Sequence, residues 1–435
     1  MTTNVPDTAI ETAPGEAESS ETAPSAPLPP SRASTAPQRW CIVTCEYPPI
    51  EGGVSDHTRL LATALAEAGD SVDVWCPPAP EDAGDVPVVE GVTVHVLPSR
   101  FGPGAIGALR RAIRALPPDV RVLVQWVPTA FGWRMMNLPF ALMLFGLPRR
   151  RLELYVHETG WEPSREPWRR ALAGMVHRVM TWLAARSAHR VFVTIPAWSN
   201  RLSLLGMRGL PPELEPEWVP VPSNLPIDAD AARARELRRA MLAGTRQRIL
   251  VGHFGTYGRW HMALMPHVVT RLLDEAGDRT MLLVGRGGEA LRDYVVGERP
   301  ELAARIVATG ALSPDEASAH LAACDVLVQP YEDGASTRRG SLMAGVALGR
   351  PTVTNRGRHT ETLWSTEKPV HLTDSPAPHA LAGAVTKLLA DAALRERIAA
   401  NARLVHAERF ALARAVAALR QPPAPPAEPR AAEER

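Results

Sequence analysis

The stretch that decides the fold reads Asp-Gly-Ala-Ser-Thr-Arg-Arg-Gly-Ser-Leu-Met-Ala and spans residues 333–344. It follows a strand-like run at 324–330 and opens a helix of small apolar residues that ends before a second strand, 352–354. The first turn of such a helix has unpaired N–H groups and the positive end of its dipole, which favour an anion. Arg338 and Arg339 can add bidentate phosphate contacts. We therefore predict a phosphate site here; the alternative is an ordinary loop whose arginines are solvated.

Glycine loops follow the first strand of each half of the chain. Gly52 and Gly53 come after the strand 40–44, and Gly255 and Gly258 come after the strand 249–254. A glycine lets the backbone approach a ligand where a side chain would collide. The common nucleotide fingerprints GxGxxG and GxxxxGK[ST] are absent from these positions. Two matched loops together with the stretch 333–344 predict a diphosphate held in a cleft.

Apolar strand-like runs alternate with helical patterns along the whole chain. In the first half they lie at 40–44, 71–75, 92–96, 122–126, 152–156 and 190–194, and in the second half at 249–254, 280–285, 306–310, 324–330 and 352–354. This alternation predicts parallel, doubly wound sheets. At 435 residues the chain is too long for one typical core. We expect two Rossmann-like α/β domains facing across a cleft, with ligands at the carboxyl ends of the strands.

Composition sets the expected domain limits. Residues 1–38 are rich in Ala, Pro, Ser, Thr and Glu without an apolar period, which predicts a disordered tail without the features of a signal peptide. We expect a first domain at 39–210, a proline-rich linker at 211–227 and a second domain at 228–410. Residues 411–435 are expected to hold the end of a helix and a second disordered tail.

Charge and cysteine content narrow the function classes. The chain has 48 basic and 47 acidic residues, so no global field favours nucleic acid, and none is expected as a partner. Its 4 cysteines form no CxxC or Cys/His pattern, which predicts buried thiols rather than metal ligands. A reducing, cytoplasmic compartment fits this usage.

Two segments bear on membranes. The most apolar run, 135–148, is interrupted by proline and glycine and is shorter than the roughly 20 residues that span a bilayer. The segment 165–190 mixes apolar residues with arginines and predicts a basic amphipathic helix, which can lie on the inner face of an anionic membrane. The alternative is that its apolar stripe belongs to the core and its arginines face water.

The order and spacing of several segments resemble the GT-B glycosyltransferases, in particular glycosyltransferase family 4, over roughly residues 39–410. The segments are Glu46–Pro49 with Gly52–Ser55, then Tyr155–Glu158, Val251–Gly255, Gly310–Ser313, Leu321–Tyr331, Gly349–Thr354 and Thr360–Glu361. The resemblance implies that a sugar is transferred from a nucleotide-sugar donor, with retention of the anomeric configuration and without a metal or other cofactor. The implied acceptor is a glycan, a lipid-linked carrier or a small molecule.

The resemblance also implies residue roles. His157 corresponds to the histidine at the family's strand end near the donor sugar, where it would stabilise developing positive charge; the alternative is that it only caps a strand. The predicted donor- and phosphate-binding residues are Gly52, Gly53, Gly255, Arg259, Asp333, Ser336, Arg338, Arg339, Ser341 and Glu361. A capping role for Glu361 is nearly as good an interpretation. Asp333 could orient the two arginines or bind a sugar hydroxyl.

One departure from the family keeps other functions open. Many members carry two glutamates eight positions apart across the donor loop, and here Ser336 and Ala344 stand in those places. Two alternatives therefore remain: a degenerate protein that binds a nucleotide sugar without transferring it, and a nucleotide-sugar epimerase. The epimerase is less well supported, because no matching set of carboxylates accompanies the loop.

Overall fold

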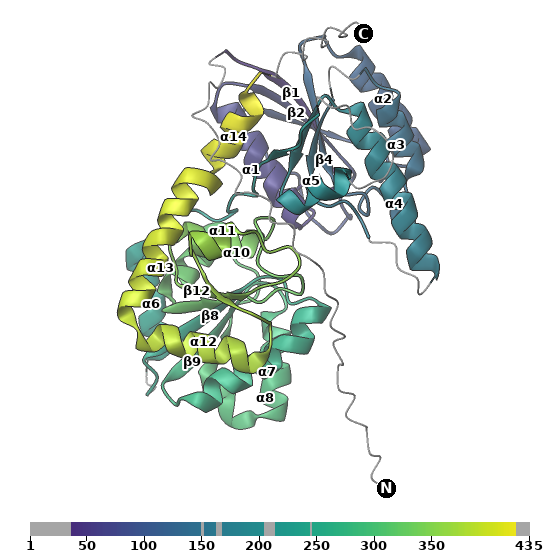
Figure 1. Cartoon of the computed structure of the whole chain (residues 1–435). Helices are drawn as coiled ribbons and strands as arrows, with labels where there is room; N and C mark the ends of the chain where they lie inside the picture. The colour runs from purple at the N-terminus through teal and green to yellow at the C-terminus, as the bar shows by residue number, and fades with distance from the viewer. Residues whose placement is uncertain (1–35, 149–151, 162–167, 204–213, 244–245, 423–435) are drawn as a thin grey trace, which may run out of the picture.

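The computed structural model describes residues 36–148, 152–161, 168–203, 214–243 and 246–422. Two α/β domains lie one above the other in Figure 1. The predicted disordered tails fall almost wholly outside these ranges, at 1–35 and 423–435. Within the described ranges, no helix combines the length and apolar character needed to cross a bilayer.

The first domain is built on a parallel sheet in which seven strands are described. Their order is β3-β2-β1-β4-β5-β6-β7. The strands are β1 (Arg39–Val43), β2 (Ser71–Cys76), β3 (Val92–Val96), β4 (Arg121–Trp126), β5 (Leu152–Val156), β6 (Arg190–Val193) and β7 (Glu217–Trp218). The central strands are buried on both faces, as their unbroken apolar runs require when helices cover both sides.

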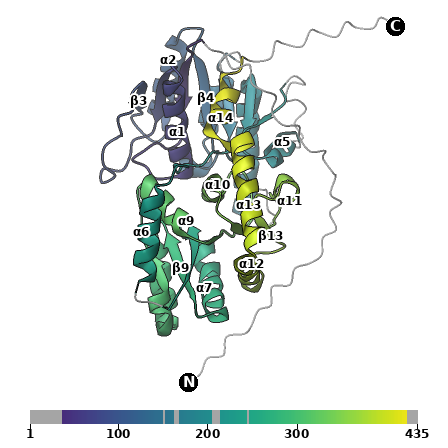
Figure 2. The same cartoon turned by 90° about the vertical axis from the view of Figure 1, so that its left-hand side faces the viewer.

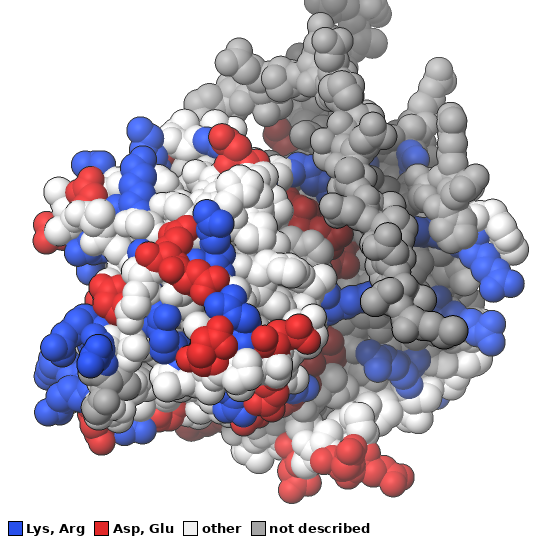
Figure 3. Space-filling view, turned by 90° about the horizontal axis from the view of Figure 1, so that it is seen from below, with Lys and Arg blue, Asp and Glu red and all other residues white. Residues whose placement is uncertain are grey.

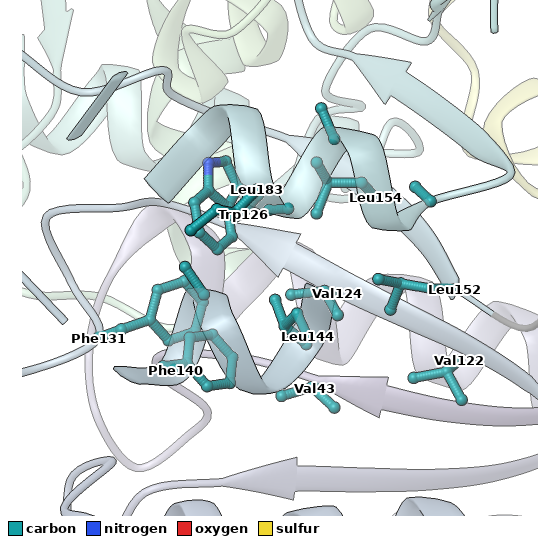
Figure 4. Packing of buried hydrophobic residues seen from close by; sticks show 14 of the residues in the cluster. Val43, Val122, Val124, Trp126, Phe131, Phe140, Leu144, Leu152, Leu154 and Leu183 are labelled. Carbon is teal, nitrogen blue, oxygen red and sulfur yellow. The ribbon is translucent and has the colours of Figure 1, made fainter. Parts of the chain in front are cut away.

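Helices cover this sheet and position its loops. They are α1 (Gly53–Glu67), α2 (Pro103–Ala115), α3 (Leu138–Phe145), α4 (Trp168–Ser187) and α5 (Pro196–Ser203), with a short 3₁₀ turn, η1 (Trp133–Met135). Aromatic side chains dominate the core under α3 and α4 (Figure 4): Trp126, Phe131 and Phe140 lie together, with ring centroids of Phe131 and Phe140 4.5 Å apart. The Trp126 indole donates to Thr181 on α4 at 3.1 Å, so its polar atom is not left unpaired in the core.

The second domain repeats the design with a parallel sheet in which six strands are described. Their order is β10-β9-β8-β11-β12-β13. The strands are β8 (Ile249–Phe254), β9 (Arg279–Val284), β10 (Ile306–Ala308), β11 (Val326–Val328), β12 (Thr352–Asn355) and β13 (His371–Thr373). The helices are α6 (Ala231–Leu242), α7 (Arg259–Glu275), α8 (Gly288–Glu298), η3 (Pro300–Arg305), α9 (Pro314–Ala323), α10 (Gly340–Ala347), α11 (Leu363–Thr366), α12 (Pro378–Ala390) and α13 (Ala392–Val405). The predicted pair of doubly wound domains is confirmed.

The chain crosses between the domains twice. The described part of the expected linker, 214–227, contributes β7 to the edge of the first sheet. Near the C-terminus, α13 runs through η4 (His406–Phe410) into α14 (Leu412–Arg420), which returns to the first domain (Figures 1 and 2). Leu419 is fully buried there in one cluster with Trp40 and Leu61. The Arg190 guanidinium donates to the carbonyls of Ala418, Leu419 and Gln421 and so satisfies the end of α14.

Basic and acidic side chains are interspersed over the face of the molecule seen from below in Figure 3. This mixing agrees with the near-zero formal net charge of +1.

Candidate functional site

The two sheets present their switch points to one another. The order of the first sheet reverses between β1 and β4, and that of the second between β8 and β11. Loops that follow such strands line the crevice where doubly wound sheets bind ligands. A cavity of about 270 Å³ lies here, lined by both domains: Glu46, Gly53, Val54, His57, Val127, His157, Glu158, Val221, Pro222, Asn224, Arg338, Arg339 and Gly340.

His157 lies directly after β5 and is 7% exposed. Its Nε2 is 2.6 Å from Oε1 of Gln125, near the end of β4. Burial, assisted by the neighbouring His57, lowers the pKa of His157 well below 6.5, so the ring is neutral at pH 7. Because an amide oxygen only accepts, the ring proton is on Nε2. The main-chain carbonyl of His157 accepts from the Trp198 indole at 2.9 Å, which fixes the turn.

Asp333 organises the loop that precedes α10. Its carboxylate is 5% exposed and forms ion pairs with both Arg338 and Arg339. Burial alone would raise the pKa of Asp333, but the two arginines hold it below its usual value. These ion pairs are the contacts expected if Asp333 orients the two arginines, and a contact with a sugar hydroxyl stays a prediction.

Arg338 also reaches across the cavity to the first domain. Its Nη1 is 3.3 Å from Oε1 of Glu158, and its guanidinium lies 5.4 Å from the Trp198 ring centre. Arg339 lies 5.2 Å from the Tyr331 ring centre. The Nε atoms of both arginines are buried without a hydrogen-bond partner. The pair is therefore held in place at the wall of the cavity, where guanidinium groups can bind an anion.

Thr337 ties the donor loop to the first domain, a contact that sequence reasoning missed. Its Oγ1 lies 2.7 Å from the carbonyl oxygen of Thr194, after β6, and accepts from the Trp218 indole at 3.2 Å. Its main-chain carbonyl accepts from Val221 at 3.0 Å. No local pattern predicts this contact, because Thr337 lies 143 residues after Thr194 and 119 residues after Trp218.

Glu361 also bonds to Thr337. Oε1 accepts from the Thr337 N–H at 2.9 Å and lies 2.6 Å from its hydroxyl, and Oε2 accepts from the Trp364 indole at 2.7 Å. Burial raises the pKa of Glu361 from 4.5 to about 7, although these hydrogen bonds oppose the rise. Glu361 does not line the cavity that His157 and the arginines share. In this structure its carboxylate is bonded to Thr337 and lines a separate cavity of about 330 Å³.

The side chain of Glu46 lies at the glycine loop of the first domain, where an anion was expected to bind. The Glu46 carboxylate accepts from the N–H groups of Val54 and Ser55, both at 3.1 Å, at the start of α1. A Cβ on Gly52 would require the carboxylate of Glu46 to shift. An anion that used this helix end would first have to displace Glu46. The predicted roles of Gly52 and Gly53 in donor binding therefore stay predictions.

The remaining predicted residues are spread around the same edge. Ser336 is fully buried with an unpartnered hydroxyl. Ser341 is bonded to the Tyr331 hydroxyl at 2.7 Å. Gly255 follows β8, and Arg259 begins α7 in an exposed position. Neither of these two lines the cavity, so the structure unites His157 with Arg338 and Arg339 but keeps Arg259 apart.

Gly334 explains the start of the donor loop. Its φ is +87°, and a Cβ there would collide with the backbone of Gly357 and the hydroxyl of Thr360. Only glycine allows the loop to pass this close to the turn after β12. Among the described residues, no group of three or more His, Cys, Asp or Glu side chains could hold a metal ion.

Comparison with protein families matches both halves of the chain. Residues 52–214 match the glycosyl transferase 4-like domain, and residues 248–391 match the glycosyl transferases of group 1. Together the two matches cover more than half of the chain. No match was found among curated proteins.

Solved structures show the same fold. Sucrose-phosphate synthase from Thermosynechococcus elongatus is 19% identical with a TM-score of 0.65, over 88% of this chain and 97% of that one. HepE of Anabaena, solved with UDP and glucose, is 16% identical with a TM-score of 0.63, over 88% and 98%. The alpha,alpha-trehalose 6-phosphate synthase of Burkholderia multivorans is 13% identical with a TM-score of 0.61, over 88% and 96%. On the strength of the two family matches, the chain belongs to the group 1 glycosyltransferases and is a glycosyltransferase with the GT-B fold.

Proposed function

We propose that this enzyme transfers a sugar from a nucleotide-sugar donor with retention of the anomeric configuration and without a metal ion. One observation carries the proposal: His157 from the first domain and Arg338 and Arg339 from the second line one cavity of about 270 Å³. A donor that bridges the domains would place its diphosphate at the arginines and its sugar at the histidine. A UDP-sugar is the first donor to test, because the structurally similar HepE was solved with UDP and with UDP-glucose.

The arginines would supply the charge that a metal provides in other transferases. The bond between the sugar C1 and the diphosphate oxygen breaks, and negative charge collects on the leaving diphosphate. Arg338 and Arg339, pre-oriented by Asp333, and the N–H groups at the start of α10 would stabilise that charge. Because the ion pairs already hold both guanidiniums, little reorganisation accompanies binding.

His157 would act on the sugar side of the breaking bond. The lone pairs of its neutral ring and of its main-chain carbonyl oxygen can stabilise the positive charge that develops near C1. Because the ring is neutral, it adds no cation that would repel this charge. The acceptor hydroxyl would attack C1 from the face that the diphosphate leaves, and its proton would pass to the departing phosphate oxygen. This sequence of events retains configuration and needs no nucleophilic side chain.

The experiment replaces His157 with alanine and follows sugar transfer and donor hydrolysis in folded protein. We expect turnover to fall by about 100-fold or more, the usual scale for a lost electrostatic contact to a transition state. The matched control is His406→Ala, a buried histidine in η4 that does not line the cavity. Unchanged turnover in His157→Ala would refute the assigned role.

The same incubations separate the alternative functions. Conversion of the donor sugar to an isomer without an acceptor would identify an epimerase. Binding of the donor with neither hydrolysis nor transfer would identify a protein that has lost catalysis. An inverted product would contradict retention, and loss of activity in EDTA, restored by a divalent cation, would contradict metal independence.

The acceptor is a glycan, a lipid-linked carrier or a small molecule, and the surface of α4 favours a lipid-linked one. Trp168, Leu172 and Met175 are 67%, 50% and 61% exposed along one face of this helix. The helix carries four arginines and no acidic residue. A cationic helix with an exposed apolar stripe suits the surface of an anionic membrane. Flotation with vesicles of phosphatidylcholine and phosphatidylserine tests this contact, and absence of co-migration at low salt would refute it.

A further inference from the structure

His57 lies in the cavity wall without any hydrogen-bond partner. It is the fifth residue of α1, is 2% exposed and lines the cavity beside His157. Its ring centre is 4.7 Å from that of His157 and 4.9 Å from that of Tyr155. Neither Nδ1 nor Nε2 forms a hydrogen bond of normal geometry, although the Gln125 side chain lies close enough to oppose the fall in the pKa of His57. A buried imidazole with two unsatisfied nitrogens is costly and calls for an explanation.

The polar side chains around His57 differ in how they are paired. The Thr58 hydroxyl donates to the carbonyl of Val54 at 2.7 Å, and the Thr44 hydroxyl to that of Glu46 at 2.8 Å. The Ser55 hydroxyl on the same helix and Nε2 of Gln125 are, like the ring nitrogens of His57, buried without a partner.

A structural histidine in the same domain looks different. His177 on α4 is fully buried, accepts from the Trp161 N–H through Nδ1 at 3.1 Å, and bonds through Nε2 to the Met135 carbonyl at 2.8 Å. Both of its nitrogens thus hold the chain together. His57 holds nothing through its nitrogens, so a purely structural role does not account for a histidine at this position.

The unpaired polar groups of His57 and Gln125 could both hydrogen-bond a hydroxyl group. Burial lowers the pKa of His57 to about 4, so its ring is neutral at pH 7 and offers one N–H donor and one acceptor. The Nε2 of Gln125 is likewise buried without a partner, while its Oε1 is engaged by His157. A hydroxyl both donates and accepts, and can satisfy groups of this kind together.

We propose that His57 is a substrate-binding residue whose ring hydrogen-bonds a sugar hydroxyl in the cavity beside His157. This proposal rests on the proposed function, since it takes the cavity to hold a sugar. The hydroxyl belongs either to the donor sugar or to the acceptor. His57 and His157 then form two adjacent contacts with the substrates, and Gln125 fixes the orientation of His157.

The first test measures stability without any ligand. His57→Phe keeps an aromatic ring but removes the unsatisfied nitrogens, so we expect an unchanged or higher melting temperature. The matched variant His177→Phe loses two hydrogen bonds, and its melting temperature should fall. If His57→Phe is destabilised as much as His177→Phe, the ring nitrogens have a structural role and the proposal is wrong.

The second test measures turnover with the sugar nucleotide that the wild type hydrolyses fastest among UDP-glucose, ADP-glucose, GDP-mannose and dTDP-glucose. In His57→Phe we expect the donor KM to rise about tenfold, because the variant loses one hydrogen bond to the substrate. A normal donor KM and hydrolysis rate with impaired transfer would assign the hydroxyl to the acceptor. Wild-type kinetics in both assays would overturn the proposal. Absence of turnover in the wild type would instead contradict the proposed function. The melting temperatures of His57→Phe and His177→Phe would still test whether the ring nitrogens of His57 have a structural role.

Discussion

Replacing Glu361 by glutamine should change how the stability of the protein depends on pH. Glu361 is the buried carboxylate that holds Thr337 and Trp364. Its pKa is raised from 4.5 to about 7, chiefly by burial. Between these two values the folded protein holds a proton on Glu361 that the unfolded chain has released.

The sign and size follow from this difference in protons. Unfolding in this window releases one proton, so the free energy of unfolding falls by about 1.4 kcal/mol for each pH unit of increase. The rise from 4.5 to about 7 is roughly 2.5 units, which gives a loss of roughly 3 kcal/mol. The stabilisation is fully present below pH 4.5 and is lost as the pH rises through 7.

Urea denaturation of wild type and Glu361→Gln at half-unit steps from pH 5 to pH 8 measures the effect. Glutamine does not titrate, so the stability of the wild type relative to the variant should fall by most of those 3 kcal/mol across the series. Other titrating groups contribute equally to both proteins and cancel. The control Glu298→Gln, at an exposed position in α8, should follow the wild type. Parallel curves for wild type and Glu361→Gln would refute the assignment.

Three further changes test other parts of the structure. Gly334→Ala should lower the free energy of unfolding by about 2 kcal/mol or more, because Gly334 has a positive φ and a Cβ there would collide with Gly357. Gly258 has open space at its Cβ, so Gly258→Ala should lower the free energy of unfolding, measured by urea denaturation, by less than half as much. Thr337→Val should loosen the contact between the domains and increase the radius of gyration in solution scattering, whereas an unchanged radius would contradict the role of this threonine. Glu46→Ala should free the start of α1, and we expect tighter binding of inorganic phosphate by calorimetry, a result that wild-type affinity would contradict.

The fold was predictable from the sequence because its strands are short, continuous apolar runs that are buried on both faces. The run 152–156 is β5 and the run 249–254 is β8, as expected. The strand β7 was not expected, because it has only two residues and lies in the proline-rich stretch that was interpreted as a linker.

The site was predictable only in part. His157, Arg338 and Arg339 come together because each follows a strand at the edge where carboxyl ends meet. The bond between Thr337 and Thr194, by contrast, joins the domains, and the position of Glu46 at α1 depends on the path of a loop. The return of α14 to the first domain also depends on a contact between chain ends, over 380 residues apart at Gln38 and Arg420. Local sequence patterns do not predict contacts between residues that lie this far apart in the chain.

A donor screen tests the central claim most directly. Wild type, Arg338→Ala and the control Arg292→Ala, a surface arginine in α8, would each be mixed with UDP-, GDP-, ADP- and dTDP-sugars, and melting temperature and nucleotide release would be followed. We predict that one nucleotide class raises the melting temperature of wild type and control, is slowly hydrolysed by both, and loses both effects in Arg338→Ala. An equal response in Arg338→Ala, or no response of the wild type to any donor, would contradict the account of a nucleotide sugar held between His157 and the paired arginines.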